Sequence, residues 1–138
     1  MRLKGGRQKV RREMLRAKVH RATVTETNLQ YEGSLTLDAS LMSAAGMVPY
    51  ERIDVYNVNS GERFSTYLIP GEPGSGVACV NGAAAHLARK GDRIIIAAYA
   101  LLEDAEIPRH RPTVVLVDPA NRIKEVRHEI AAGTLVPA

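Results

Sequence analysis

The segment Tyr31-Glu32-Gly33-Ser34 places a hydroxyl nucleophile directly after a glycine, at the start of a predicted strand. Glycine adopts backbone conformations closed to other residues, so the Gly33–Ser34 peptide can be held in a strained geometry. A serine held there can attack the Gly33 carbonyl and form an ester by an N→O acyl shift. β-Elimination of the Gly33 carboxylate then leaves a dehydroalanine, which hydrolyses to a pyruvoyl group. On its own, however, a Gly-Ser pair is more often an ordinary turn.

The other reactive side chains form no recognisable catalytic motif. The four histidines are widely scattered: His20, His86, His110 and His128. The single cysteine, Cys79, excludes an internal disulfide and a cysteine-built metal site, and we interpret it as a small buried filler. Gly74-Ser75-Gly76 is a glycine turn without the basic residue and helix of a phosphate loop. We therefore expect no metal centre.

The elements that must position these residues are mainly short strands. Alternating or β-branched patterns predict strands at 19–25, 33–38, 53–58, 63–69, 93–99, 112–117 and 121–126. Asp38 and Gly46 are typical first and last caps of a helix at 39–45, and a second short helix should follow Asn81 and end at Gly91. Turn residues fall at 59–61 and 70–76. The pattern predicts one small, mostly β barrel domain with short helices.

Composition limits the class of protein. The chain has 138 residues, 45% hydrophobic and 25% charged, which is ordinary for a globular domain. It contains neither an apolar run of membrane-spanning length nor a secretory signal, so we expect a cytoplasmic protein. Residues 1–21 carry a net charge of +8 against +4 for the whole chain, so the remainder is acidic at −4. This basic arm is either a solvated, frayed terminus or a contact for nucleic acid, and the absence of aromatic residues there disfavours the second reading.

The chain as a whole resembles the pyruvoyl-dependent L-aspartate α-decarboxylases. The stretches that carry the resemblance are, in chain order, 18–25 (KVHRATVT), 31–34 (YEGS), 45–46 (AG), 59–67 (NSGERFSTY), 80–86 (VNGAAAH), 91–92 (GD) and 94–99 (IIIAAY). The likeness extends from about Met14 to Asn121. Its motifs are collectively specific because they occur in the family's order and spacing.

The resemblance implies a six-stranded double-psi β-barrel that assembles as a homotetramer. It also implies self-cleavage between Gly33 and Ser34 into a β chain of residues 1–33 and an α chain of residues 34–138. Ser34 would become a covalent pyruvoyl group that forms a Schiff base with L-aspartate, without pyridoxal phosphate or a metal. The enzyme would release CO2 and β-alanine for pantothenate and coenzyme A synthesis. A maturation factor could assist cleavage. The expected organisation is a flexible basic extension at 1–13, the barrel at 14–128 and a C-terminal tail at 129–138.

By position, the resemblance assigns a role to each site residue. Tyr67 would be the proton donor, and Thr66 would contact substrate and assist cleavage by donating to the Gly33 carbonyl. Cations that hold the substrate carboxylates would be Lys18 and Arg63. The loop that cradles substrate would comprise Asn81, Gly82, Ala83 and Ala84, with the following helix N-terminus favouring an anion.

Three features depart from the family pattern. Residues precede the usual start, so initiation at Met14 is an alternative to Met1. Tyr56 stands where some relatives carry a larger aromatic, and His110 replaces the aromatic usually found before Arg-Pro. The competing functions are an unprocessed barrel paralogue that binds small carboxylates and a nucleic-acid-binding β module that uses the basic arm.

Overall fold

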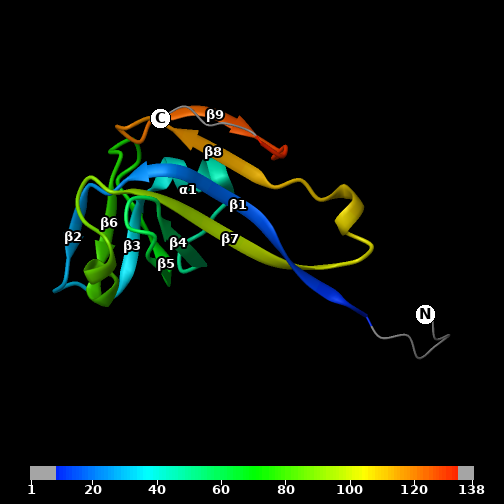
Figure 1. Ribbon diagram of the computed structural model, residues 1–138, viewed down its shortest axis with the longest axis horizontal. Coiled ribbons are helices and arrows are strands. Elements are labelled where there is room, and N and C mark those ends of the chain that lie inside the picture. Colours follow the sequence, from blue (N-terminus) through cyan, green and yellow to red (C-terminus); the bar gives the residue numbers. More distant parts are fainter. Residues whose placement is uncertain (1–8, 134–138) are drawn as a thin grey trace.

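The computed structural model describes residues 9–133, and its nine strands pair in one sheet in the order β2-β6-β3-β5-β4-β7-β1-β8-β9 (Figure 1). The strands are β1 (Arg11–Thr23), β2 (Glu26–Asn28), β3 (Ser34–Asp38), β4 (Arg52–Asn57), β5 (Arg63–Gly71), β6 (Ala78–Asn81), β7 (Arg93–Glu103), β8 (Thr113–Val117) and β9 (Ile123–Arg127). The helices are α1 (Ala39–Ala45) and two 3-10 helices, η1 (Gly82–Leu87) and η2 (Ile107–Arg109). The mostly β fold expected from the sequence is confirmed.

Each of the seven expected strand segments overlaps an observed strand, and two further strands, β2 and β6, bring the number in residues 9–133 to nine. Sequence patterns missed these two because β2 has three residues and β6 has four, too few for an alternation to register. The expected second helix is also different. It is a six-residue 3-10 helix, η1, which has no side-chain cap at Asn81. Anion binding at the N-terminus of this helix stays a prediction.

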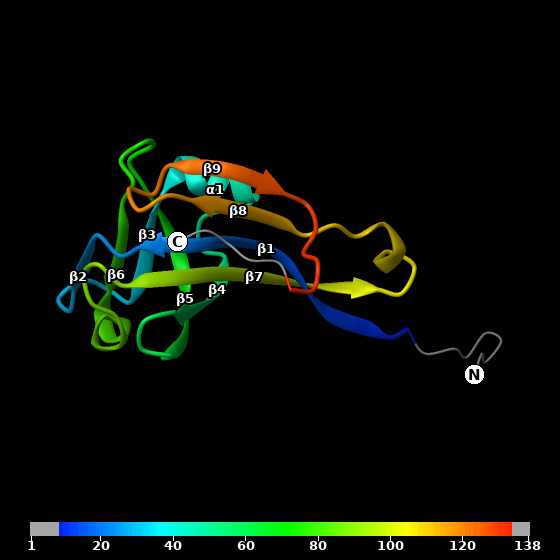
Figure 2. The same cartoon turned by 45° about the horizontal axis from the view of Figure 1, so that its top comes forward.

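The longest pairing joins β1 to β7 in antiparallel register, and the two strands project together beyond the other strands (Figure 2). The pairing starts at Arg11 with Glu103, so residues 11–13, which the sequence analysis assigned to a flexible extension, belong to the strand. Arg12 forms an ion pair with Asp104, and Lys9 lies 4.0 Å from Glu103. Residues 1–8 of that extension and 134–138 of the expected tail lie outside the described residues.

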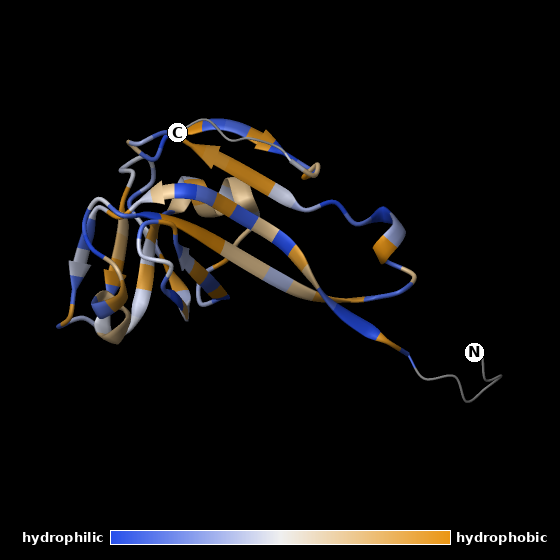
Figure 3. Cartoon of the chain, viewed as in Figure 1, coloured by the Kyte–Doolittle hydropathy of each residue, from blue (hydrophilic) through white to orange (hydrophobic). Residues whose placement is uncertain are grey.

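The core is built from Val, Ile, Leu and Ala, as the low aromatic content requires. In β1, Ala17 and Val19 are fully buried while the residues between and beside them are partly exposed. Figure 3 shows hydrophilic and hydrophobic residues alternating along the same strand. Leu35 and Leu37 of β3 face the same core, together with Leu68 of β5. Burial of such side chains contributes about 1.5–3 kcal/mol each. The core therefore fixes which faces of β3 and β5 remain for polar residues.

Helix α1 has the caps that its sequence predicts. The Asp38 carboxylate accepts from the Ser40 amide, and Gly46 ends the helix with a left-handed φ of 71°. The same carboxylate accepts from the amides of Gly74 and Gly76, at 3.0 and 2.8 Å. The glycine turn thus wraps around a buried aspartate. Burial alone would raise the pKa of Asp38, but the hydrogen bonds from Ser40, Gly76 and Gly74 together lower it.

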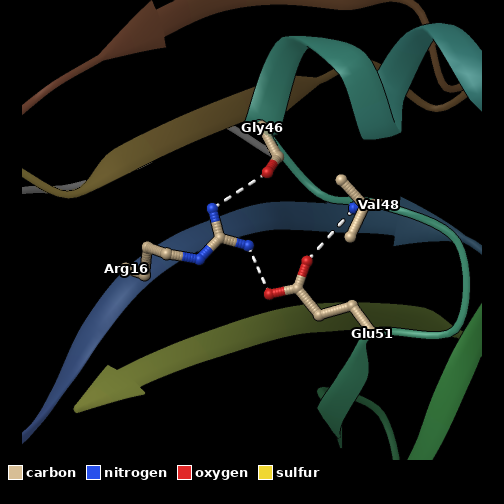
Figure 4. Close-up of polar contacts among 4 residues, drawn as sticks. All are labelled: Arg16, Gly46, Val48 and Glu51. Atoms are coloured by element: carbon tan, nitrogen blue, oxygen red, sulfur yellow. Dashed lines mark hydrogen bonds and ion pairs between the residues drawn. The ribbon is translucent and has the colours of Figure 1, made fainter.

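Arg16 connects β1 to the end of α1 (Figure 4). Its guanidinium donates to the Gly46 carbonyl at 2.9 Å and forms an ion pair with Glu51. The other carboxylate oxygen of Glu51 accepts from the Val48 amide at 3.1 Å. Gly46, Val48 and Glu51 all lie in the connection between α1 and β4. Arg16 therefore fixes this connection against β1.

Candidate active site

Ser34 is the first residue of β3, and its side chain is 5% exposed. β3 pairs antiparallel with β6 so that Ser34 lies opposite Asn81. The Asn81 side-chain amide donates to Ser34 Oγ at 3.1 Å and to Thr36 Oγ1 at 3.0 Å, while the Ser34 hydroxyl donates to the Glu32 carbonyl at 3.3 Å. A buried serine held by a side-chain donor differs from an exposed turn serine. Ser34 therefore belongs to a strand and not to an exposed turn.

Gly82 lies against the backbone of Gly33. A Cβ at Gly82 would be 2.5 Å from Gly33 Cα and 2.6 Å from Gly33 N, and Gly82 has a φ of +69°. Gly33 has no positive φ, and a Cβ placed on it would meet no atom within 4 Å. The expected strained conformation of Gly33 is therefore absent from the uncleaved chain. The residue at this contact that must be glycine is Gly82, for both its φ and its space.

Thr66 and Tyr67 approach Ser34 through strand register. β5 runs parallel to β3 with Leu68 beside Leu35, so the preceding residue, Tyr67, lies level with Ser34. Both Thr66 and Tyr67 are partly exposed, and no described residue hydrogen-bonds to either hydroxyl. Their hydroxyls are therefore free to contact a bound molecule. Among residues 9–133, Thr66 does not donate the expected hydrogen bond to the Gly33 carbonyl.

Lys18 and Arg63 each lack an acidic partner within 4 Å among residues 9–133. Burial lowers the pKa of Lys18, which lines a cavity of about 340 Å³ with His20, Arg127 and Glu129. Residues 130–133, from the start of the expected tail, also line this cavity. Arg63 places its guanidinium carbon 4.7 Å from the ring centroid of Tyr56. A partly buried cation without a carboxylate partner is suited to bind an anionic group.

Arg63 lies over the ring of Tyr56, and Tyr56 contacts a second tyrosine, Tyr99. The sequence did not predict this pair. The hydroxyls of Tyr56 on β4 and Tyr99 on β7 are 2.8 Å apart. Burial, the Tyr99 hydrogen bond and nearby charge raise the pKa of Tyr56 to about 12, so its phenol stays protonated at neutral pH. The sequence carried no signal for this contact because the two residues are 43 positions apart. Strand pairing between β4 and β7 brings them together.

The structure therefore brings together Gly33, Ser34, Asn81 and Gly82, with Thr66 and Tyr67 on the adjoining strand. Lys18 and Ser34 are not on paired strands. Lys18 lies on β1, whose strand partners are β7 and β8, whereas β3 pairs with β5 and β6. Ala83 and Ala84 follow Gly82 in η1.

Among residues 9–133, no three potential ligand side chains gather into a metal site, and no helix has the length and hydrophobicity to cross a membrane.

Comparison with known proteins decides the family. The family model described as aspartate decarboxylase matches residues 10–124. This chain belongs to the aspartate decarboxylase family. It is 60% identical over 116 residues to aspartate 1-decarboxylase of Methylibium petroleiphilum, which covers 84% of this chain and 97% of the relative.

Two further family members show the same extent of similarity. Aspartate 1-decarboxylase of Geobacillus sp. is 50% identical over 125 residues, covering 91% of this chain and 98% of the relative. That of Syntrophobacter fumaroxidans is 60% identical over 113 residues, covering 82% and 91%. The matched region includes every residue of the candidate active site, from Lys18 to Ala84. The nucleic-acid-binding alternative is not favoured by these matches.

Proposed function

We propose that the protein is a self-processing aspartate 1-decarboxylase that converts L-aspartate to β-alanine and CO2 for pantothenate synthesis. Membership of the aspartate decarboxylase family supports the reaction. The observation that carries the proposal for this chain is the buried Ser34 hydroxyl, which directly follows Gly33 and accepts a hydrogen bond from the Asn81 side chain. The enzyme class is a carbon–carbon lyase.

Self-cleavage would proceed at the Gly33–Ser34 bond by the N→O acyl shift and β-elimination expected from the sequence. Ser34 Oγ bonds to the Gly33 carbonyl carbon, the peptide C–N bond breaks, and the hydroxyl proton goes to the freed amine. Loss of the Ser34 α proton expels the Gly33 carboxylate, and one water then replaces the nitrogen as ammonia. The products would be residues 1–33 and a chain of residues 34–138 that starts with a pyruvoyl group. The residues fit this chemistry, because Asn81 places a donor at Oγ as that oxygen loses its proton.

The pyruvoyl ketone, once formed, would bond to the substrate amine and accept the electron pair released with CO2. The other roles belong to side chains of the chain itself. Tyr67 lies level with Ser34 and would donate the proton that replaces CO2. Thr66 and the backbone of Gly82, Ala83 and Ala84 would contact the bound substrate. Lys18 and Arg63 would neutralise the substrate carboxylates.

Lys18 and Ser34 lie on strands that do not pair with each other. We propose that a site containing both residues is completed between chains of an assembled enzyme. The homotetramer is proposed on this ground and on the family resemblance, and a maturation factor remains part of the proposal. Mixing inactive Lys18→Ala chains with inactive Ser34→Ala chains should restore part of the activity. Absence of activity in the co-expressed mixture would contradict a shared site.

The direct test of function is release of CO2 from L-aspartate labelled at the α-carboxylate. Purified protein should release CO2 and form β-alanine in equal amounts, and Ser34→Ala should do neither. Tyr67→Phe should still be cleaved at Gly33–Ser34 but should turn over slowly, because it lacks the phenolic proton. Full activity in Tyr67→Phe would remove Tyr67 from the donor role. A cleaved wild-type protein without decarboxylation would contradict the substrate assignment.

A further inference from the structure

Cys79, the only cysteine, lies two residues before Asn81 in β6 and makes a specific hydrogen bond. Its side chain is buried, and its thiol donates to Asn81 Oδ1 at 3.0 Å. Asn81 Nδ2 in turn donates to Ser34 Oγ and Thr36 Oγ1. A continuous chain of hydrogen bonds therefore runs from the thiol to the serine. The interpretation of Cys79 as a filler of space does not account for this bond.

The thiol decides which way the Asn81 amide faces. The hydroxyls of Ser34 and Thr36 can each donate or accept, so they would tolerate either the oxygen or the nitrogen of the amide. A thiol donates through its one S–H and accepts only weakly. Its bond to Oδ1 therefore favours the orientation in which Nδ2 faces Ser34. In the opposite orientation, the amide would present an acceptor to Ser34 Oγ, where the developing negative charge of the attacking oxygen needs a donor.

Glu26 on β2 is a second acceptor for the same thiol proton, since it pairs with Cys79 across the β2–β6 register. The Glu26 side chain is exposed and can bond to water, whereas Asn81 is buried and its amide oxygen would lose its donor. Leaving a buried acceptor without a partner is unfavourable. The buried bond is therefore favoured. Burial raises the pKa of Cys79, and the charge of Glu26 raises it further, so the thiol keeps its proton at neutral pH.

We propose that Cys79 is a positioning residue for self-cleavage, whose thiol orients the Asn81 amide so that Nδ2 donates to Ser34 Oγ. This inference rests on the proposed self-processing function. Cys79 touches no reacting atom and acts only through Asn81. The consequence is that the rate of cleavage depends on a hydrogen-bond donor at position 79.

The test follows cleavage over time by intact-mass spectrometry of freshly purified full-length chains. Cys79→Ala should slow cleavage about three- to tenfold, which is the effect of one lost hydrogen bond. Cys79→Ser keeps a donor and should cleave within about twofold of the wild-type rate. Cys79→Val fills the space without a donor and should be as slow as Cys79→Ala. Wild-type cleavage by Cys79→Val, or equal slowing by Cys79→Ser, would overturn the inference.

A double variant separates positioning from general weakening of the structure. Asn81→Ala alone should slow cleavage, and adding Cys79→Ala should slow it no further, because the thiol acts through the amide. Multiplied effects in the double variant would overturn the inference, even if each single variant were slow. Failure of the proposed function gives a different result: wild-type protein would then remain uncleaved. In that case both proposals would be overturned, whereas cleavage that ignores position 79 overturns only this one.

Discussion

The backbone of Gly82 packs directly on Gly33, 49 residues earlier in the chain, so that even one added carbon would come within 2.5 Å of Gly33 Cα. Strand pairing between β3 and β6 produces this approach, because Ser34 and Asn81 are partners in the register. Gly33, which precedes Ser34, and Gly82, which follows Asn81, therefore lie against each other. The contact fixes the peptide that the proposed reaction must cleave.

Gly82→Ala should block self-cleavage for this reason. The added methyl group overlaps backbone atoms that cannot move aside, and its φ of +69° is strained for alanine. We expect cleavage to slow more than about tenfold, as the displaced Gly33 carbonyl leaves the reach of Ser34 Oγ. Intact mass measured over days after purification gives the rate.

The matched control for Gly82→Ala is Gly61→Ala. Gly61 has a similar φ of +80°, but a Cβ there would meet no atom within 4 Å. This control should lose about 1–2 kcal/mol of stability from backbone strain and cleave normally. Equal cleavage by both variants would show that the Gly82 contact is unimportant.

Tyr56→Leu should weaken substrate binding. Removing the ring beneath the Arg63 guanidinium loses a cation–π contact of about 0.5–1 kcal/mol at an exposed site, which corresponds to a two- to fivefold higher KM for L-aspartate. Tyr56→Phe keeps the ring and loses only the bond to Tyr99, so its KM should rise less. Steady-state kinetics distinguish the two, and an unchanged KM in Tyr56→Leu would mean that Tyr56 does not hold Arg63 for the substrate.

Asp38→Asn should destabilise the fold. The carboxylate accepts hydrogen bonds from Ser40, Gly74 and Gly76, and an amide cannot accept them all. We expect a loss of about 1–3 kcal/mol in the free energy of unfolding by urea.

Asp38 also predicts an acid limit of stability. The folded state lowers its pKa, so the unfolded chain binds the proton more readily. The stability from this group is complete above the ordinary pKa of an aspartate and is lost as pH falls toward the lower folded value. Asp38→Asn should flatten this part of the pH profile, and an unchanged slope would assign the acid sensitivity to other carboxylates.

His20 predicts a second pH dependence, at higher pH. Burial lowers its pKa to about 4, aided by the positive charges of Lys18 and Arg21. The unfolded chain, with an ordinary histidine, therefore binds more protons between about pH 6.5 and pH 4, and stability falls as the pH decreases through that window. Replacing the ring by His20→Gln should reduce the fall. A wild-type thermal midpoint that stays constant from pH 7 to pH 4 would contradict the assignment.

Local signals in the sequence were sufficient for features within a few residues of one another. Asp38 and Gly46 placed α1 correctly because a cap is determined by its neighbours. The second short helix also lies where the sequence placed it, after Asn81. The local pattern did not show that it would be a 3-10 helix over Gly82–Leu87.

Contacts between distant segments were the part that the sequence could not provide. The glycine freedom expected at Gly33 is required at Gly82, because the close approach depends on β3–β6 pairing. The same pairing places Asn81, which accepts the Cys79 hydrogen bond within β6, opposite Ser34 of β3. The resemblance to a family assigned the site residues by their position in the chain. Only the register of the paired strands shows which of these residues contact one another.

The most direct test of the account is the intact mass of purified, aged protein under denaturing conditions. The account predicts two species: residues 1–33, and residues 34–138 lighter than the serine form by one ammonia. Ser34→Ala, as control, should give one uncleaved chain. A single uncleaved mass for the wild-type protein, unchanged after incubation with cell lysate that would supply a maturation factor, would contradict the claim that Ser34 becomes the reactive group.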